Sequence, residues 1–269
     1  MLGNNNRKGM LGIKISIITV SFNQGQFIED NILSVLNQEY SNVEHIIIDA
    51  GSKDQTLDIL KKYDKYLTWI SEPDNGQSEG LNKGFKRATG DIIGWINSDD
   101  RLAPGALIKV AEFFNCNPEE IAVVGNQAVI NVNGEIQRVI KSREYTADYL
   151  INHARGITQN STFFKRELFK KIGYLNEKLN YAMDSDLFIR IAKIKTMAYI
   201  NETLGEFRIQ PASKTARGTF LFSKELIGIR RRYGGKCFSP GMINDFYVIT
   251  TEPLRRIVWL RKLIQNLRK

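Results

Sequence analysis

The sequence predicts an α/β fold in which helices flank a mostly parallel central sheet. Short apolar or β-branched runs alternate with amphipathic helical patterns of roughly 10–12 residues, which is typical of βαβ units. Three of these runs end in polar residues, over 19–23, 49–54 and 97–100. Right-handed crossovers bring the carboxyl ends of parallel strands to one edge, and open α/β sheets bind ligands there. We therefore expect a binding site at this edge.

The first part of the chain carries the clearest alternation of strands and helices. Ser52 stands where it can cap the second expected helix. Gly76, Gly80 and Gly84 recur every four residues at the third expected helix, where close packing explains them better than ligand binding. The expected strands are Lys14–Val20, Val43–Asp49, Leu67–Ser71 and Asp91–Asn97, and the expected helices run from about Phe27 to Asn37, from Ser52 to Tyr63 and from Ser78 to Ala88.

Beyond Asp100 the pattern changes to a hairpin and longer loops. Asn133-Gly134 between two apolar runs predicts a hairpin turn. The expected elements are a helix over Pro104–Phe114, hairpin strands over Ile121–Val132 and Glu135–Ile140, a helix with the stripe Leu187, Ile191 and Ile194, and a strand over Thr203–Ile209.

The composition is that of a soluble globular protein with a positive net charge. Of its 269 residues, 42% are apolar and 25% are charged, and the net charge of +9 makes a polyanionic partner plausible. Cys116 and Cys237 form no metal-binding spacing, which favours a reducing compartment. No apolar run reaches the roughly 18–20 residues that span a bilayer, and the start lacks a signal-peptide core. We expect a cytoplasmic protein.

Two adjacent carboxylates, Asp99 and Asp100, directly follow the strand Asp91–Asn97. They repel each other and need a compensating cation. Hard divalent ions such as Mg²⁺ take carboxylate oxygens and complete their shell with waters and phosphates. The alternative is a solvated turn or a helix N-cap that leads into the Pro104 segment. Neither G-x-G-x-x-G nor G-x-x-x-x-G-K-[ST] is present, so a nucleotide diphosphate bound here would need a metal.

Four motifs, in order, resemble the family 2 glycosyltransferases (GT2), which are inverting enzymes of the GT-A fold. The motifs are TVSFN over Thr19–Asn23, IDAGSKDQT over Ile48–Thr56, EPDNGQSEGLNKG over Glu72–Gly84 and ATGDIIGWINSDD over Ala88–Asp100. The resemblance runs from Ile15 to about Pro211. It implies transfer of a sugar from a nucleotide-diphosphate sugar, with uridine as the favoured base, to an acceptor hydroxyl with inversion. The setting it implies is bacterial surface polysaccharide or lipid-linked glycan assembly.

The resemblance also divides the chain. Residues 1–12 would be a flexible leader, 13–102 the nucleotide-sugar-binding half, 103–218 the acceptor-binding half of the same GT-A domain, and 219–269 a basic helical C-terminal extension.

Matching positions of the motifs carry the expected site. Thr19 and Asn23 would line the nucleotide pocket, Asp49 would meet the base or ribose, and Asp74 would support the base. Together, the residues expected to bind the nucleotide sugar are Thr19, Asn23, Asp49, Asp74, Gln77, Lys83 and Asp99.

The pair Asp99 and Asp100 matches the DXD-type motif of the family. Asp99 would face the donor ribose or sugar, and Asp100, together with Asp99, would bind Mg²⁺ or Mn²⁺. The segment MDSDLFIR resembles the part of the family that carries the catalytic base six residues before an arginine. Counting back from Arg190 selects Asp184, with Asp186 as the runner-up. Both could instead serve the N-terminus of a helix.

The chain departs from the family pattern at two positions. Ala50 follows Asp49 where many relatives carry a second acidic residue or a glycine, and Gln210 stands where relatives often have histidine. Arg208, and with it Ser213 and Lys214, could bind phosphate oxygens near this loop. The only histidines, His45 and His153, match no motif position, and we expect no histidine base.

The basic stretch Pro253–Lys269 predicts an amphipathic helix with a tryptophan. It suits an anionic membrane at the inner face of the plasma membrane, which would point to a lipid-linked glycan acceptor. It could equally dock on the protein body or on a second subunit in a homodimer. Two other classes remain open: a nucleotidyltransferase acting on sugar phosphates, and a non-catalytic protein that binds an anionic ligand. We do not expect nucleic-acid binding, because the basic residues lack interleaved aromatic residues.

Overall fold

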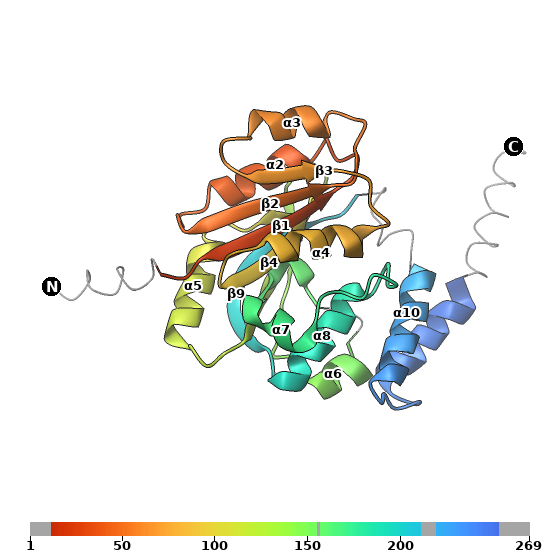
Figure 1. Cartoon of the computed structure of the whole chain (residues 1–269). Helices are drawn as coiled ribbons and strands as arrows, with labels where there is room; N and C mark the ends of the chain where they lie inside the picture. Colours follow the sequence, from red (N-terminus) through yellow and green to blue (C-terminus); the bar gives the residue numbers. More distant parts are fainter. Residues whose placement is uncertain (1–11, 155–156, 211–218, 253–269) are drawn as a thin grey trace, which may run out of the picture.

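The computed structural model describes residues 12–154, 157–210 and 219–252. Its strands are β1 (Ile15–Ser21), β2 (Val43–Asp49), β3 (Thr68–Ser71), β4 (Ile92–Asn97), β5 (Arg101–Leu102), β6 (Ala122–Ile130), β7 (Ile136–Ile140), β8 (Thr162–Lys165) and β9 (Ala198–Arg208). Its α-helices are α2 (Ile28–Leu36), α3 (Thr56–Lys62), α4 (Gln77–Arg87), α5 (Ala106–Cys116), α6 (Ala147–Asn152), α7 (Phe169–Ile172), α8 (Met183–Ile194) and α10 (Thr219–Arg232), and residues 240–252 are also helical. The strands form one nine-stranded sheet in the order β3-β2-β1-β4-β8-β6-β9-β5, with β7 paired to β6. Figure 1 shows β3, β2, β1 and β4 side by side in this order.

The sheet is parallel in its first part and mixed in its second. β1 lies parallel to β2 and β4, and β2 lies parallel to β3. Beyond β4 the direction alternates, because β8 is antiparallel to both β4 and β6, whereas β9 is parallel to β6. The predicted α/β fold with a mostly parallel sheet is confirmed, and the antiparallel pairs gather where the sequence pattern changes after Asp100.

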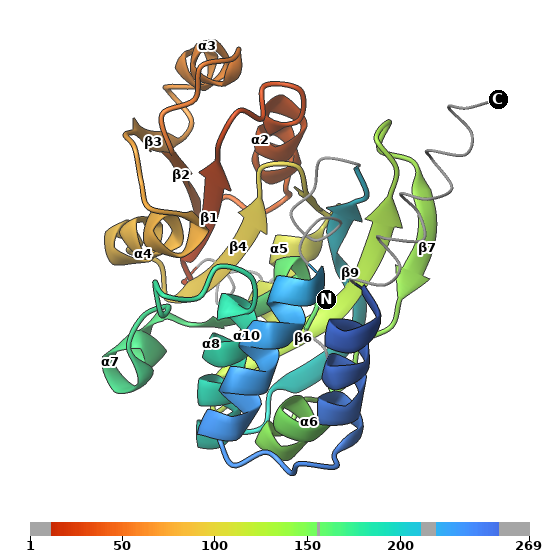
Figure 2. The same ribbon diagram turned by 90° about the vertical axis from the view of Figure 1, so that its right-hand side faces the viewer.

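Helices cover both faces of the sheet (Figures 1 and 2). On one face, Phe85 of α4 and Phe188 of α8 pack on Trp95 of β4, with ring centroids 5.5 and 5.6 Å away. On the other face, α2 and α5 bury apolar side chains such as Val35 and Leu107 against β1 and β4. Burying this much apolar surface is the main force that holds the layers together.

The glycines of α4 serve close packing, as predicted. A Cβ atom on Gly84 would lie 2.5 Å from Cγ2 of Ile18 in β1. A Cβ atom on Gly80 would lie 2.9 Å from Oδ2 of Asp74 and 3.2 Å from Cγ1 of Val20. The helix can therefore approach the sheet only because these positions have no side chain.

The C-terminal helices are joined to the body by a buried arginine. The Nε of Arg230 in α10 donates to Oδ2 of Asp245 at 2.8 Å, and its Nη2 donates to the carbonyl oxygen of Ala154 at 2.6 Å. Both charged side chains of the pair are almost fully buried.

In the part of the chain that the structure describes, we find no helix with the length and apolar character needed to cross a bilayer. The predicted leader over 1–12, apart from its last residue, and the predicted helix Pro253–Lys269 lie outside the described residues.

Candidate active site

The carboxyl ends of the first parallel strands lie side by side. The register pairs Asp49 at the end of β2 with Ser21 of β1 and with Ser71 of β3. It also pairs Asn97 at the end of β4 with Val20 of β1. The polar strand ends therefore meet at one edge, as the sequence predicted.

Asp49 organises the turn that follows β2. Its fully buried carboxylate accepts hydrogen bonds from the backbone N–H groups of Gly51 and Ser52, at 3.1 and 2.9 Å, and from the hydroxyl of Ser71 at 2.6 Å. The hydroxyl of Ser52 also donates to it. The expected cap of α3 by Ser52 is wrong, because that hydroxyl is bonded to Asp49 and accepts from the N–H of Asn23 at 2.7 Å.

The two residues expected from the end of β1 differ in their placement. Asn23 is exposed, and its side-chain oxygen accepts from the N–H of Lys53 at 2.8 Å, which ties the β1 and β2 turns together. Thr19 is fully buried, and its hydroxyl lies 2.9 Å from Nε2 of His45 and 3.3 Å from Oδ1 of Asn31. Thr19 thus lies beneath the edge and does not line it. Burial lowers the pKa of His45 to about 3, so this histidine is neutral.

The start of α4 joins the turn after β3 to the end of β4. The side chain of Gln77 donates to Oδ1 of Asn97 at 2.8 Å. Asp74 accepts from the N–H of Gly76 at 2.9 Å, and burial raises the pKa of Asp74. Lys83, one turn and a half further along, forms ion pairs with Glu79 at 2.9 Å and Glu72 at 3.0 Å. A donor phosphate would have to compete with these two carboxylates for Lys83.

The carboxylate pair follows β4 directly. Asp100 is 1% exposed, and its Oδ1 accepts from the backbone N–H of Arg208 at 2.9 Å. Burial raises the pKa of Asp100 well above its ordinary value, and the charge of Asp99 adds to this. Asp99 accepts from the side chain of Gln210 at 2.7 Å, so the residue at the usual histidine position does reach the pair. Asp100 does not cap a helix, because α5 begins only at Ala106.

Arg208 holds this pair in place. Its buried guanidinium donates to the carbonyl oxygen of Asp99 at 2.8 Å and to that of Val132 at 2.9 Å, and it forms an ion pair with Asp30 of α2. Its side chain also lies over the ring of Phe27, 5.0 Å from the centroid. The guanidinium of Arg208 therefore bonds to protein groups, and this geometry does not provide the predicted contact with a phosphate. Ser213 and Lys214 lie outside the described residues.

Asp184 is in the first turn of α8. Burial raises the pKa of Asp184 to about 6, with a smaller contribution from the charge of Glu225. Asp186, the runner-up, is almost fully buried and forms an ion pair with Arg190 at 3.0 Å while accepting from the hydroxyl of Tyr233 at 3.0 Å. Neither carboxylate caps α8, whose N-cap residue is Ala182 with no side-chain cap bond. Asp186 therefore anchors the helix, and Asp184 fits the role of a base better.

The segment before α8 lies between α4 and α10. Asn180 approaches Gly76 so closely that a Cβ there would lie 3.2 Å from Oδ1 of Asn180, and the hydroxyl of Ser78 donates to the carbonyl oxygen of Leu179 at 2.7 Å. On the other side, Glu225 of α10 accepts from three successive backbone N–H groups, at residues 180, 181 and 182. No local sequence pattern marks Glu225, because its partners lie more than 40 residues away.

The carboxylate pair suits a hard divalent cation. Asp99 and Asp100 supply oxygen ligands, and burial together with the charge of Asp99 raises the pKa of Asp100, so a cation beside the pair would stabilise its charged form. Among the described residues, we find no group of three or more His, Cys, Asp or Glu side chains placed to hold an ion. An ion here would thus depend on phosphate oxygens and waters for the rest of its shell, as Mg²⁺ commonly does.

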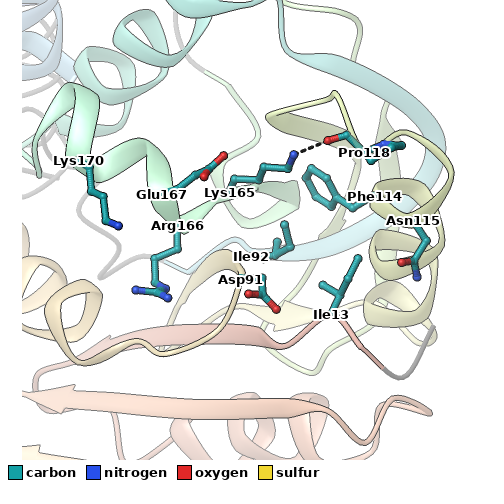
Figure 3. A pocket seen from close by; sticks show the side chains of 10 residues that line it. All are labelled: Ile13, Asp91, Ile92, Phe114, Asn115, Pro118, Lys165, Arg166, Glu167 and Lys170. Atoms are coloured by element: carbon teal, nitrogen blue, oxygen red, sulfur yellow. Dashed lines mark hydrogen bonds between the residues drawn. The ribbon is translucent and has the colours of Figure 1, made fainter. Parts of the chain in front are cut away.

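A hollow of about 540 Å³ lies at the opposite edge of the sheet (Figure 3). Ile13 and Asp91, which precede β1 and β4, line it together with Lys165 and Arg166. Arg166 donates to the carbonyl oxygen of Gly90 at 2.6 Å. Because this hollow faces the amino ends of the strands, it is separate from the site described above.

Comparisons with known proteins agree on one family. The family model described as glycosyl transferase family 2 matches residues 16–173, more than half of the chain. An uncharacterized glycosyltransferase of Rickettsia typhi is 26% identical over 209 residues, which are 75% of this chain but only 65% of that protein. The putative teichuronic acid biosynthesis glycosyltransferase TuaG of Bacillus subtilis is 27% identical over 238 residues, covering 83% of this chain and 92% of that protein.

Two solved structures show the same fold. Residues 1–349 of TarS from S. aureus, in complex with UDP-GlcNAc, superpose with a TM-score of 0.63 at 19% identity, covering 81% of this chain and 66% of that one. The mannosyltransferase PcManGT from Pyrobaculum calidifontis, in complex with GDP-Man and Mn²⁺, superposes with a TM-score of 0.62 at 18% identity, covering 88% and 70%.

Proposed function

The chain belongs to glycosyl transferase family 2, and we propose that it transfers a sugar from a nucleotide-diphosphate sugar to an acceptor hydroxyl with inversion. The α/β fold of the GT-A class and the family that the sequence indicated are thereby confirmed. We propose UDP as the nucleotide of the donor, a choice that the UDP-GlcNAc complex of TarS supports. The biosynthetic relative TuaG supports a role in surface polysaccharide or lipid-linked glycan assembly.

One observation carries this proposal: the start of α4 lies against two segments, one leading to the carboxylate pair and the other leading to Asp184. Gln77 donates to Asn97, which stands two residues before Asp99. A Cβ atom on its neighbour Gly76 would lie 3.2 Å from Asn180, which stands four residues before Asp184. A donor bound against this helix start would therefore have the carboxylate pair on one side and the base on the other.

The carboxylate pair would serve the leaving group. Asp99 and Asp100 would hold Mg²⁺ or Mn²⁺, which when bound supplies positive charge to the departing diphosphate. The Mn²⁺ complex of PcManGT supports a divalent ion for this fold. Arg208 and Gln210 fix the positions of the two carboxylates. We propose that Asn23, Asp49, Asp74, Gln77 and Lys83 form or support the nucleotide side of the site, with Thr19 beneath it.

Asp184 would act as the general base. The acceptor hydroxyl loses its proton to this carboxylate as its oxygen attacks the anomeric carbon, and the bond from that carbon to the diphosphate breaks. Attack from the face opposite the leaving group inverts the configuration. A pKa of about 6 leaves Asp184 mostly deprotonated at neutral pH and still basic enough to accept a proton.

The test is release of UDP from a panel of UDP-sugars, compared between the wild type and Asp184→Asn. We expect the variant to lose transfer by at least about a hundredfold, the lower end of the range for general acid–base catalysis, while it binds UDP with unchanged affinity. Asp186→Asn serves as the comparison, because it should lower the melting temperature through its lost ion pair with Arg190. Near-normal turnover in Asp184→Asn would show that the base is another group.

A further inference from the structure

The positive charge of the protein is concentrated at its C-terminal end. Residues 219–269 contain eleven Lys and Arg against three Asp and Glu, and so hold eight of the nine net positive charges. The remaining 218 residues are close to neutral. Of the C-terminal cations, Arg231 and Lys236 are exposed, whereas Arg230 is buried in its pair with Asp245. The charge is thus a property of one region and not of the whole surface.

The same region exposes an apolar face. In the helical residues 240–252, Met242 and Asp245 point inward and are buried, at 1% and 0% exposure. The outward face carries Ile243, Phe246 and Tyr247, which are 55%, 43% and 54% exposed, and Phe238 just before the helix is 89% exposed. We call these four residues the apolar face. A surface helix normally turns its apolar stripe inward, so this reversed arrangement indicates a partner.

We infer that the apolar face docks on a membrane surface that contains anionic lipid, and that exposed cations of the same C-terminal region, such as Arg231 and Lys236, contact the headgroups. Aromatic and aliphatic side chains flanked by Lys and Arg are the composition that interfacial helices use. Residues 253–269, outside the described part, add six Lys and Arg and no acidic residue directly after this helix. A second copy of the chain fits less well, because pairing would bring two strongly positive regions together.

The two C-terminal helices lie beside each other, at the lower right of Figure 1, whereas α3 and β3 are at the top. Figure 2 shows them covering the body next to α6. Docking through the apolar face would therefore leave the parallel strands β1 to β3 away from the lipid. This inference does not depend on the proposed transfer reaction.

The test is flotation of the full-length protein with vesicles of phosphatidylcholine alone or with about one third phosphatidylglycerol. We expect binding only to the anionic vesicles, with strong weakening at about 0.5 M salt. The double variant Ile243→Ser/Phe246→Ser should bind the anionic vesicles at least about tenfold more weakly, because it removes apolar surface that would enter the membrane. Tyr66→Ser is the matched control, since Tyr66 is 66% exposed before β3, outside the apolar face, and its variant should bind as the wild type does.

Three results would overturn the inference. One is absence of wild-type binding to anionic vesicles. Another is a double variant that binds as well as the wild type but melts at a lower temperature, which would assign the apolar face to contacts within the chain. The third is a wild-type dimer in light scattering that the double variant converts to monomer, which would assign the face to a second copy. Circular dichroism verifies that the double variant is folded.

Discussion

Glu225 offers a sharp test of how the C-terminal helices serve the site. Its carboxylate accepts hydrogen bonds from the backbone N–H groups of Asn180, Tyr181 and Ala182, at 2.9, 2.9 and 2.8 Å, directly before α8 begins. Replacing it by alanine removes the acceptor that fixes this segment, and with it the start of the helix that carries Asp184. We expect Glu225→Ala to impair catalysis more than folding.

The contacts of Glu225 set the size of the expected losses in stability and in catalysis. Hydrogen bonds to a charged group contribute about 1.5–3 kcal/mol each, but Glu225 is only half-buried and water can replace much of its contribution. We therefore expect a loss of about 1–2 kcal/mol in the free energy of unfolding, or roughly 2–8 °C in melting temperature. A displacement of about 1 Å at a reacting group can cost about a hundredfold, so kcat should fall by about 10- to 100-fold.

Glu225→Gln removes the negative charge and keeps one acceptor oxygen, which can still accept from the N–H groups of Tyr181 and Ala182 that share Oε2. Burial raises the pKa of Asp184 to about 6, and the negative charge of Glu225 raises it further by disfavouring a second carboxylate nearby. A base must be deprotonated to act, so the wild-type kcat should rise with pH through about 6. Neutralising Glu225 lowers the pKa of Asp184, and the acidic limb of the profile should move to lower pH.

Initial rates of UDP release across pH 4.5 to 8, roughly the range that brackets this titration, measure both quantities. Lys224→Ala is the matched control, because Lys224 is an exposed neighbour on the same helix. Wild-type kcat in Glu225→Ala, together with an unmoved acidic limb in Glu225→Gln, would refute the reasoning.

Two further variants test the donor side. Arg208→Lys keeps the charge but loses the planar guanidinium that reaches the carbonyl oxygens of Asp99 and Val132. The metal-dependent affinity for UDP should therefore fall at least about tenfold. An unchanged affinity in titration calorimetry would show that Arg208 does not position the carboxylate pair. Asp49→Asn places an NH₂ group among donors that need an acceptor, so urea denaturation should show a loss of about 1–3 kcal/mol. If stability were unchanged, the turn after β2 would not depend on the Asp49 carboxylate.

The sequence predicted the sheet and the polar residues at its strand ends well, because both depend on local patterns. The apolar run Val43–Asp49 is strand β2 with the same bounds, and the motif residues Asp99 and Asp100 follow β4 as expected. Thr19 shows the limit of strand-end reasoning. Side chains alternate along a strand, so Thr19 shares the face of Ile15 and Ile17 and points into the core beneath α2.

Long-range partners could not be predicted. Arg208 meets Asp100 across 108 residues, and Glu225 meets Ala182 across 43. No periodicity or spacing along the chain encodes such contacts, because they arise only when the sheet order brings β9 beside β5 and when α10 packs next to α8. The predicted helix cap at Ser52 was wrong for a related reason. The hydroxyl of Ser52 donates to Asp49 and accepts from the N–H of Asn23, 29 residues before it, and it makes these bonds instead of capping α3.

The most direct test of the central claim is isothermal titration of the protein with UDP, with and without Mn²⁺, in the wild type and in Asp100→Asn. Asp58→Asn is the control, because Asp58 is a highly exposed carboxylate on α3. We predict that UDP binds more tightly with Mn²⁺, and that Asp100→Asn loses this gain while Asp58→Asn keeps it. UDP binding that depends neither on Mn²⁺ nor on Asp100 would contradict a metal-diphosphate site at the end of β4.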